Sequence, residues 1–475
     1  MSRLTRREVL KTSLAAAGGA LAVGRSRSFG QVAGAHERIR IAVAGINGRG
    51  VSHIDEYLGM NDVEIAYLVD PDSRLFGGQA RRIEKKTGRP PRTVQDIRRV
   101  LDDKNVDAIS IATPNHWHAL MTIWACQAGK DVYVEKPMSH NIHEGRLAVE
   151  MAARYNRIVQ HGTQSRSKGG WEHVAASIAS GQLGKLLVAR GLCYKQRPSI
   201  GFKKPTTPPK ELDFDLWLGP APQQPFHENL VHYNWHWFWD TGNGDIGNQG
   251  VHEMDMARWG IPGARLPRSV ISLGGRFGYE DQGQTANTQI AIFDYGDTQL
   301  IFEVRGLPSK PYQISKGVGN VWHLDTGTIR GGAFYPKGEE KGQGLPVKGK
   351  VGPGDGHFRN FIAAMRSRKQ ADLNAPILEG HYSSALCHLA NASYRLGELV
   401  PFNPRTKAFG DNKEAYDTLA RMEEHLTDNG LKLEGMKYRL GRKLIVNPQT
   451  ELTDDPQANE ILTGSFRGKY SVATA

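Results

Sequence analysis

The chain has few cysteines and no apolar run of membrane-spanning length. Cys126, Cys193 and Cys387 are scattered over 475 residues, so a disulfide framework is not indicated and each is expected to be a small buried hydrophobe. The N-terminal apolar run, residues 14–23, is too short to cross a bilayer as a helix. No zinc-type spacing of cysteine and histidine occurs, and no metal site is predicted.

A basic block interleaved with aromatic side chains is also missing. The formal charge is +12, but the first 35 residues carry +5 of it and the rest is spread thinly. A nucleic-acid partner is therefore not expected. The apolar share of 39% and the charged share of 23% are typical of a globular protein, and the length predicts two domains.

The N-terminus has the pattern of an export signal. Arg6-Arg7 precedes a weakly apolar run from Leu14 to Val23, and Ala33-Gly34-Ala35 supplies a small-x-small cleavage pattern. This order resembles a twin-arginine signal peptide. It predicts a mature N-terminus near His36 and passage of the folded protein through the twin-arginine machinery to the periplasm or another extracytoplasmic compartment. The alternative is a basic tail with no export function.

A glycine-rich turn follows the first predicted strand. Residues 38–44 alternate and then become apolar, which predicts a buried parallel strand. The strand leads into Gly45-Ile46-Asn47-Gly48-Arg49-Gly50, and a helical pattern begins at Val51. A turn in this context binds a dinucleotide, with the pyrophosphate at the helix N-terminus. Gly45 would allow the sharp turn and Gly50 the close helix packing, whereas Asn47 replaces the usual second glycine.

An acidic residue follows the second predicted strand. Residues 63–69 are largely apolar and lead into Asp70, 20 residues after Gly50, where an acid accepts hydrogen bonds from the adenosine ribose. A carboxylate there favours NAD over NADP because it repels a 2′-phosphate, although the nearby Arg74 keeps NADP open. The alternative role for Asp70 is a helix cap ahead of Ser73.

Two further predicted strands deliver polar residues to the same edge. Residues 106–112 lead into Thr113-Pro114-Asn115, a helix is predicted over residues 119–128, and residues 131–134 lead into Glu135-Lys136-Pro137. Repeated strand–helix units predict a doubly wound parallel sheet, and ligands bind at the carboxyl ends of its strands. The pattern therefore predicts an α/β fold with an N-terminal Rossmann domain and places Lys136 at its mouth. The alternative for Lys136 is a surface ion pair with Glu135 or Asp131.

These motifs together resemble the Gfo/Idh/MocA oxidoreductases, named for glucose–fructose oxidoreductase and inositol dehydrogenase. The resemblance rests on the glycine turn, on Ala112-Thr113-Pro114-Asn115 with His118-Ala119, and on Glu135-Lys136-Pro137. It continues through residues 162–166, 181–185 and 250–255. It implies a Rossmann domain followed by a C-terminal α/β domain with an open, mostly antiparallel sheet, whose outer face often forms an oligomer interface.

The resemblance also implies catalytic roles. Lys136 would bind the reacting sugar hydroxyl, and His252 would be its acid/base partner, a task that suits an imidazole with a pKa near neutrality. The alternative for His252 is a buried histidine that caps a helix. Many relatives have an aspartate four residues before this histidine, whereas this chain has Asn248. Asparagine can hydrogen-bond but carries no charge, so Asp245 and Asp255 are candidates for the missing carboxylate.

The remaining site predictions divide into cofactor and substrate contacts. The predicted cofactor contacts are Gly45, Asn47, Gly48, Arg49, Gly50, Asp70, Thr113, Pro114, Asn115, His118, Glu135 and Gln164. The predicted substrate contacts are Arg166, Trp235, Asp245, Asn248 and Asp255. Trp235 lies in an aromatic run, residues 233–239, whose flat faces suit sugars, with core packing as the alternative. A structural ion pair is the alternative for Arg166.

Three functions fit these predictions. The first is an exported NAD(P)-dependent oxidoreductase with a tightly bound cofactor, which transfers a hydride to or from a hydroxyl of a sugar, polyol or sugar derivative. The second is a redox-neutral, NAD-dependent glycosidase that oxidises the sugar at C3, eliminates the glycoside and reduces the product again. The third is a non-catalytic carbohydrate-binding protein on the same fold.

The predicted organisation has three parts. Residues 1–35 form the signal peptide, residues 36–160 the Rossmann domain, and residues 161–475 a substrate-binding and oligomerisation domain of a homo-oligomer. Residues 305–357 are rich in Gly, Lys and Pro and predict a long excursion from the sheet. Amphipathic helices are predicted over residues 357–365 and 379–396, and the charged tail beyond residue 405 carries no motif.

Overall fold

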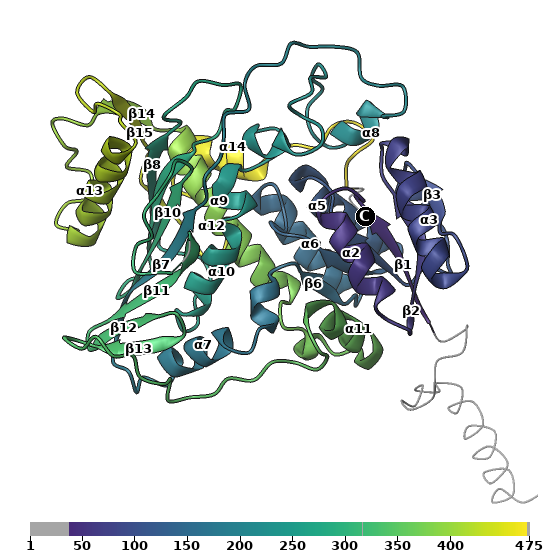
Figure 1. The fold of residues 1–475 in the computed structure, drawn as a ribbon, viewed down its shortest axis with the longest axis horizontal. Helices are drawn as coiled ribbons and strands as arrows, with labels where there is room; N and C mark the ends of the chain where they lie inside the picture. The colour runs from purple at the N-terminus through teal and green to yellow at the C-terminus, as the bar shows by residue number, and fades with distance from the viewer. Residues whose placement is uncertain (1–37, 316, 473–475) are drawn as a thin grey trace, which may run out of the picture. The chain divides into compact units, whose positions relative to one another are not determined.

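The computed structural model describes residues 38–315 and 317–472, so the predicted signal peptide lies outside the described part. Six strands form a parallel sheet in the order β3-β2-β1-β4-β5-β6 (Figure 1). They are β1 (Ile39–Ala44), β2 (Val63–Val69), β3 (Arg92–Val94), β4 (Ala108–Ile111), β5 (Asp131–Val134) and β6 (Val159–His161). The strand order reverses between β1 and β4, which is where doubly wound sheets bind their ligands.

Helices cover both faces of this sheet. They are α2 (Arg49–Leu58), the short η1 (Ser73–Leu75), α3 (Phe76–Thr87), α4 (Arg98–Leu101), α5 (Asn115–Gln127) and α6 (Ile142–Arg154). In β1, Ile41 and Val43 pack into one core cluster and Ala42 and Ala44 into another. All four are fully buried, because helices on both faces leave a parallel strand no solvent-exposed side.

A second, ten-stranded sheet follows. Its strands are β7 (Leu186–Tyr194), β8 (Ser269–Gly275), β9 (Thr288–Asp294), β10 (Gln299–Arg305), β11 (Val318–Leu324), β12 (Gly327–Arg330), β13 (Ala333–Pro336), β14 (Glu398–Pro401), β15 (Lys437–Leu440) and β16 (Leu444–Ile445). Strands β7 and β10 pair in parallel, and the other pairs are antiparallel. The predicted fold class, a Rossmann sheet plus a mostly antiparallel sheet, is confirmed.

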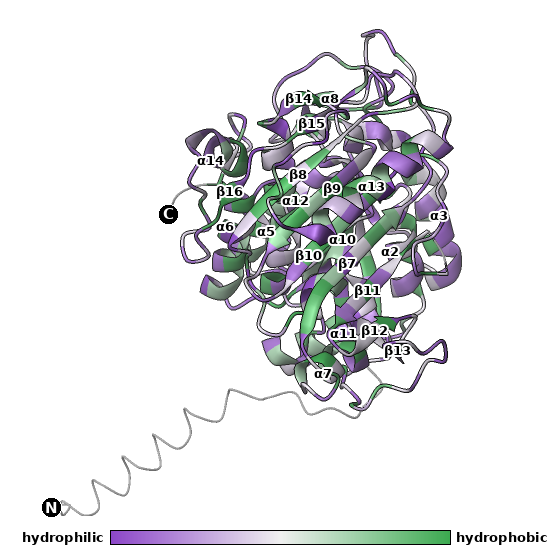
Figure 2. Cartoon of the chain, turned by 90° about the vertical axis from the view of Figure 1, so that its left-hand side faces the viewer, coloured by the Kyte–Doolittle hydropathy of each residue, from purple (hydrophilic) through white to green (hydrophobic). Residues whose placement is uncertain are grey.

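The two faces of the large sheet carry different helices. The elements outside the sheets are η2 (Gln164–Ser167), α7 (Trp171–Ala179), α8 (Phe214–Leu218), η3 (Asn234–Trp237), α9 (Gly244–Asn248), α10 (Val251–Trp259), α11 (His357–Ser367), η4 (Gln370–Asp372), α12 (Ile377–Arg395), α13 (Lys413–Asp428) and α14 (Pro456–Thr463). Helices α10 and α12 pack on the face toward the Rossmann domain, and α13 packs on the opposite face (Figure 1). Figure 2 looks onto that opposite face, where mainly hydrophobic strands lie behind the more hydrophilic α13.

Several predicted boundaries need correction. Helix α5 begins at Asn115, not at residue 119, because Pro114 already serves as its N-cap. Residues 305–357 are only partly an excursion, since β11, β12 and β13 extend the sheet by hairpin pairing. The tail beyond residue 405 contains α13, two strands and α14. Strand β3 was not predicted, because its three residues are too few to show a period.

Segments far along the chain complete the Rossmann core. The predicted helix over residues 357–365 is α11, and its Phe358 stacks on Tyr133 of β5 with ring centroids 4.4 Å apart. The three cysteines are buried and unpaired, as predicted. Within the described ranges, no helix is both long and apolar enough to cross a membrane.

Candidate functional site

The glycine turn between β1 and α2 lines a cavity of about 470 Å³. Gly45 has a φ of +76°, and a Cβ there would lie 2.6 Å from the Ala112 carbonyl oxygen. A Cβ on Gly50 would lie 1.8 Å from the carbonyl oxygen of Gly45. Both glycines are therefore required where they were predicted, the first for its positive φ and the second for close packing. Asn47, Gly48 and Arg49 line the cavity with Gly45, whereas Gly50 lies behind its wall.

Asp70 stands at the end of β2 and closes one end of the cavity. One carboxylate oxygen accepts a hydrogen bond from the Ile46 amide at 3.0 Å, and the other accepts one from the Asp72 amide at 3.0 Å. Burial raises the pKa of Asp70 to about 6. The helix cap considered for Asp70 is made by Asp72, whose side chain accepts from the Arg74 amide and also binds the Arg74 guanidinium.

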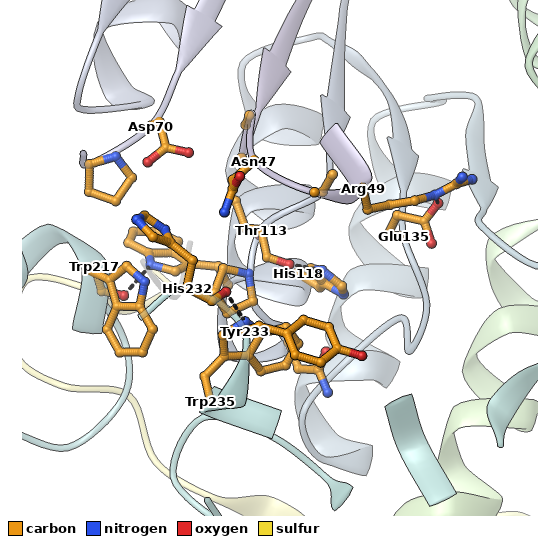
Figure 3. Close-up of a pocket in the computed structure, with 18 of the residues that line it drawn as sticks. Asn47, Arg49, Asp70, Thr113, His118, Glu135, Trp217, His232, Tyr233 and Trp235 are labelled. Atoms are coloured by element: carbon orange, nitrogen blue, oxygen red, sulfur yellow. Dashed lines mark hydrogen bonds and ion pairs between the residues drawn. The ribbon is translucent and has the colours of Figure 1, made fainter. Parts of the chain in front are cut away.

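The loop after β4 lies on the opposite side of the glycine turn. The Thr113 hydroxyl is buried and has no hydrogen-bond partner among the described residues. His118 lies one turn into α5, and its ring nitrogens contact the carbonyl oxygens of Pro137 at 2.6 Å and Thr113 at 2.8 Å. Asn115 donates to the Asn243 side chain at 2.9 Å. His118 and Asn115 therefore position the loop, and Thr113 keeps a free polar atom at the cavity (Figure 3).

Glu135 connects the glycine turn to the end of β5. Its carboxylate accepts from Arg49 Nε at 2.7 Å, contacts His53 Nε2 at 3.2 Å and accepts from Gln164 Nε2 at 2.9 Å. Burial alone would raise the pKa of Glu135, but the contacts with His53 and Arg49 outweigh it and hold the pKa well below the ordinary value. Gln164 does not line the cavity itself, so it would act on a cofactor only through Glu135.

Lys136 lies half-buried in the cavity wall, between the Rossmann domain and α9. Its Nζ donates to the main-chain oxygen of Asn248. Burial lowers the pKa of Lys136 below its ordinary value, although Glu135 acts in the opposite direction. The surface ion pair considered for Lys136 is not formed: Glu135 binds Arg49 and His53, and Asp131 binds Arg368.

His252 lies near Lys136, in the first turn of α10. Burial, and then the charge of Lys136, lower its pKa to about 3. This differs from the near-neutral pKa expected from the sequence, because neither effect is visible there. The ring is therefore neutral over the physiological range and serves as a hydrogen-bonding group more readily than as a strong base.

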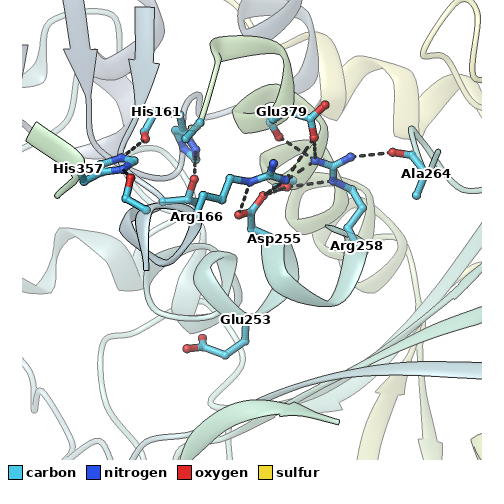
Figure 4. A network of polar contacts seen from close by, with 12 residues as sticks. His161, Arg166, Glu253, Asp255, Arg258, Ala264, His357 and Glu379 are labelled. Carbon is cyan, nitrogen blue, oxygen red and sulfur yellow. Dashed lines mark hydrogen bonds and ion pairs between the residues drawn. The ribbon is translucent and has the colours of Figure 1, made fainter. Parts of the chain in front are cut away.

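Arg166 and Asp255 lie away from the cavity, in a buried ion pair. Arg166 Nε donates to Asp255 Oδ2 at 2.8 Å, and its NH2 group donates to Asp255 Oδ1 at 2.9 Å. Figure 4 shows Arg258 and Glu379 completing this network, while Glu253 points away from it. The structural alternative for Arg166 therefore holds, and neither residue lies where a substrate contact was predicted.

The substrate end of the cavity combines predicted and unpredicted residues. Of the predicted substrate contacts, Trp235 and Asn248 line the cavity, whereas Asp245 lies behind the wall and binds Arg197. Lys195, Arg197 and Gln249 also line the cavity, and Arg197 and Gln249 were not predicted. The aromatic run was predicted either to face a sugar or to pack in the core, and it does both kinds of packing. Tyr233 and Trp235 face the cavity, while Trp237 and Phe238 are core residues.

A segment of the second domain, residues 209–219, contacts the residues that follow the carboxyl end of β2, and it is called the strap here. Its Glu211 carbonyl accepts from the Ser73 amide at 3.0 Å, and its Asp213 amide donates to the Pro71 carbonyl at 2.9 Å. Leu216 and Trp217 then line the cavity at the Asp70 end. The strap therefore forms a wall where a dinucleotide would place its adenosine.

Comparison with known proteins agrees with this geometry. Residues 39–163 match the NAD-binding Rossmann fold of the Gfo/Idh/MocA oxidoreductase family, and residues 194–263 match the family's C-terminal alpha/beta domain. Two stretches of the chain are therefore similar to the two domains of the Gfo/Idh/MocA oxidoreductases. The Rossmann match covers the glycine turn, Asp70 and Lys136, and the C-terminal match covers Asn248 and His252.

Curated relatives match the chain over shorter stretches. The scyllo-inositol 2-dehydrogenase (NAD(+)) of Bacillus subtilis is 27% identical over 160 residues, which is 34% of this chain and 45% of that protein. Glycosyl hydrolase family 109 protein 1 of Shewanella sp. (strain ANA-3) is 29% identical over 136 residues, or 28% of this chain and 29% of that protein. The matched region thus spans less than half the length of either relative.

Solved structures of other proteins share the fold. The WlbA dehydrogenase of Bordetella pertussis, solved with NADH and UDP-GlcNAcA, aligns with a TM-score of 0.55 at 18% identity and covers 75% of this chain and 97% of that one. A probable dehydrogenase from Thermotoga maritima aligns with a TM-score of 0.50 at 16% identity, over 74% of this chain and 95% of that one. At sequence identities this low, the alignments are evidence for a shared fold and not for a shared substrate or activity.

Proposed function

We propose that the protein is an NAD-dependent oxidoreductase that acts on a hydroxyl of a sugar, polyol or sugar derivative. The observation that carries the proposal is the position of Lys136, which shares one cavity with the glycine turn, Asp70 and the aromatic wall of the second domain. Such a cavity joins a dinucleotide site to a site for a small polar ligand.

The residues present fit a dinucleotide. The glycine turn has no room for a Cβ at Gly45 or Gly50, the Thr113 hydroxyl is buried without a partner, and the Asp70 carboxyl faces the cavity. Asp70 would hold the adenosine ribose, and the α2 N-terminus the pyrophosphate. Because Asp72 already binds Arg74, that arginine is less available to a 2′-phosphate, which favours NAD over NADP.

The chain's own groups would manage the hydroxyl and its proton. When bound, NAD would supply the hydride acceptor or donor. Lys136, with its lowered pKa, is suited to hold the substrate oxygen and to take its proton. His252 is neutral and lies near Lys136 without lining the cavity, so its role as the partner of Lys136 stays a prediction. Asn248 contributes its main-chain oxygen to Lys136, so in this chain the peptide at position 248 contacts the lysine.

The strap supports tight retention of the cofactor. Besides its contacts at β2, the Asp215 side chain binds Arg467 at 2.6 Å and Tyr470 at 3.0 Å, while His116 Nε2 contacts the Trp217 carbonyl oxygen at 2.9 Å. The strap is thus held at the end of β2, at the C-terminal segment and at α5, so it would rarely move away from the cavity. Retained NAD favours the second candidate, a redox-neutral glycosidase, because such an enzyme never exchanges its cofactor.

One experiment separates the two enzymes. Purified protein is mixed with free sugars, polyols and aryl glycosides without added cofactor, while absorbance at 340 nm and aglycone release are recorded. An oxidoreductase accumulates reduced cofactor, whereas the glycosidase releases aglycone with no net change at 340 nm. Neither signal, with or without added NAD, would leave the carbohydrate-binding protein as the answer.

Export is a further part of the proposal and rests on the sequence alone. Arg6-Arg7, the apolar run and the Ala33-Gly34-Ala35 pattern support passage through the twin-arginine machinery. Replacing both arginines with lysine should leave the protein in the cytoplasm, as judged by cell fractionation. Unchanged export of that variant would contradict the proposed route.

A further inference from the structure

Three cations converge on the substrate end of the cavity. Lys136 follows β5, whereas Lys195 and Arg197 follow β7 and lie two residues apart. All three line the cavity. Each of them binds a different residue in α9 or directly after it.

The three contacts differ in whether they neutralise charge. Arg197 forms a two-point ion pair with Asp245, Nε to Oδ2 at 2.7 Å and NH2 to Oδ1 at 2.6 Å. Lys136 contacts only a main-chain oxygen, that of Asn248. Lys195 Nζ contacts the amide oxygen of Gln249 at 3.3 Å. Neither lysine pairs with a carboxylate among the described residues, so their charges are uncompensated by the protein.

The carboxyl groups nearby do not change this balance. Glu135 binds Arg49, and Asp96 binds Arg98 at 2.7 Å. Glu253 is buried and accepts only weakly, at 3.3 Å, from the Gln249 amide. Burial also raises the pKa of Glu253 to about 8, so it is mostly uncharged at neutral pH. The substrate end therefore carries net positive charge.

We propose that the substrate is a sugar with an anionic group, a carboxylate or a phosphate ester, and that Lys195 binds this group. The inference rests on the proposed function and refines its substrate class. Arg197 cannot readily take the role, because Asp245 occupies Nε and NH2 and its NH1 donates to the Tyr233 hydroxyl at 3.0 Å. Lys195 uses one of its three donors on Gln249 and is exposed at the cavity mouth.

The test compares matched sugars on the NAD-loaded protein. Glucose, galactose and mannose are each paired with the corresponding uronic acid and 6-phosphate, and dissociation constants are measured by calorimetry at low and high salt. For at least one sugar, an anionic member should bind about tenfold tighter than the neutral one, and salt should weaken that preference. The preferred member, uronic acid or phosphate, identifies the anionic group.

Variants assign the preference to Lys195. Lys195→Gln keeps a polar side chain beside Gln249 and should abolish the anionic preference while leaving neutral-sugar binding within about twofold. Lys341→Gln removes the same charge from an exposed position that does not line the cavity and should change neither. Equal binding of neutral and anionic members in every pair, or an undiminished preference in Lys195→Gln, would overturn the inference.

Recording absorbance at 340 nm in the same samples separates this inference from the proposed function. Lys195-dependent binding of an anionic sugar without cofactor reduction or glycoside cleavage would support the inference and contradict the proposed chemistry. Turnover of neutral sugars, with no anionic preference in any pair, would support the chemistry and contradict the inference.

Discussion

At the scale of single residues, the site depends on a lysine whose surroundings favour its neutral form more than water does. Lys136 is half-buried, contacts a main-chain oxygen and has no paired carboxylate among the described residues. Burial is the main reason that its pKa is lowered. His252 beside it stays neutral because its own pKa is about 3. The pair therefore has one group, Lys136, whose pKa lies below that of an ordinary lysine, and one, His252, whose pKa is too low for it to titrate near neutrality.

This arrangement predicts the pH dependence of catalysis. Neutral Lys136 accumulates as the pH rises toward its lowered pKa, so kcat/KM should increase with pH and level off below the ordinary pKa of a lysine. His252 should add no acidic limb above about pH 5, since its charged form is already gone there. The measurement is a pH profile of kcat/KM for the oxidation. Lys136→Arg, which keeps the charge but cannot release a proton, should lower the rate by about 10²-fold or more. A rate that falls as the pH rises from 6 to 9 would contradict this role.

The sequence predicts which residues share a location where that location depends on local spacing. The glycine turn, Asp70, Thr113 and Lys136 all follow strands of one parallel sheet, so their shared edge follows from the strand pattern alone. Arg197 and Asp245 are 48 positions apart and meet only through the second domain. The pKa of His252 likewise depends on burial between domains, which no local pattern reports.

At the scale of elements, buried charges connect η2, α10 and α12. Arg166 and Arg258 both contact Asp255, and both reach Glu379 at the start of α12. Burial alone would raise the pKa of Asp255, but Arg166 and Arg258 outweigh it and lower it. The carboxylate is thus held charged, and it fixes the helix that carries His252.

Removing that carboxylate should destabilise the protein. Asp255→Asn keeps the shape but leaves two buried guanidinium groups with one fewer partner, which should cost about 3–5 kcal/mol in the free energy of unfolding. Chemical denaturation measures the change. Asp411→Asn, an exposed change elsewhere, serves as the control and should cost less than about 0.5 kcal/mol. A loss as small as the control's would show that the network does not stabilise the fold.

The strap gives a second prediction at this scale. Asp215→Ala removes the side chain that binds Arg467 and Tyr470 and should increase the dissociation rate of NAD by about tenfold. Nucleotide fluorescence after dilution measures the rate, with Asp411→Ala as the control. If NAD leaves both variants at the wild-type rate, the C-terminal contact of the strap does not retain the cofactor.

Element predictions failed where strands are short or pairing is distant. Strands β12 and β13 have four residues each and lie among glycines and lysines, and this composition predicts a loop. They form strands because β12 pairs with β11 and β13 pairs with β12. Helix α13 does carry an amphipathic pattern, since Ala415, Leu419, Met422 and Leu426 recur at helical spacing and are buried. This helix could have been predicted from the sequence and was missed. Longer elements such as β1, β2 and α12 carry their own period and were predicted within a few residues.

At the scale of the whole molecule, two sheets meet around one cavity, and each supplies half of the site. The Rossmann sheet contributes the glycine turn, Asp70 and Lys136, and the second domain contributes the strap, the aromatic wall and the cations after β7. Helix α13 covers part of the large sheet's outer face, which the resemblance implies as an oligomer interface. The homo-oligomer remains a prediction, and α13 would have to be part of any contact there.

The most direct test of the account follows the bound cofactor through one turnover. Purified protein is denatured to identify its nucleotide by mass spectrometry, and native protein is mixed with a substrate found in the screen while absorbance at 340 nm is recorded. The account predicts bound NAD and a burst of reduction in the wild type. It also predicts a rate lowered by about 10²-fold or more in NAD-loaded Lys136→Met. Equal reduction rates in the two proteins, or a wild type that neither contains nor binds NAD, would contradict it.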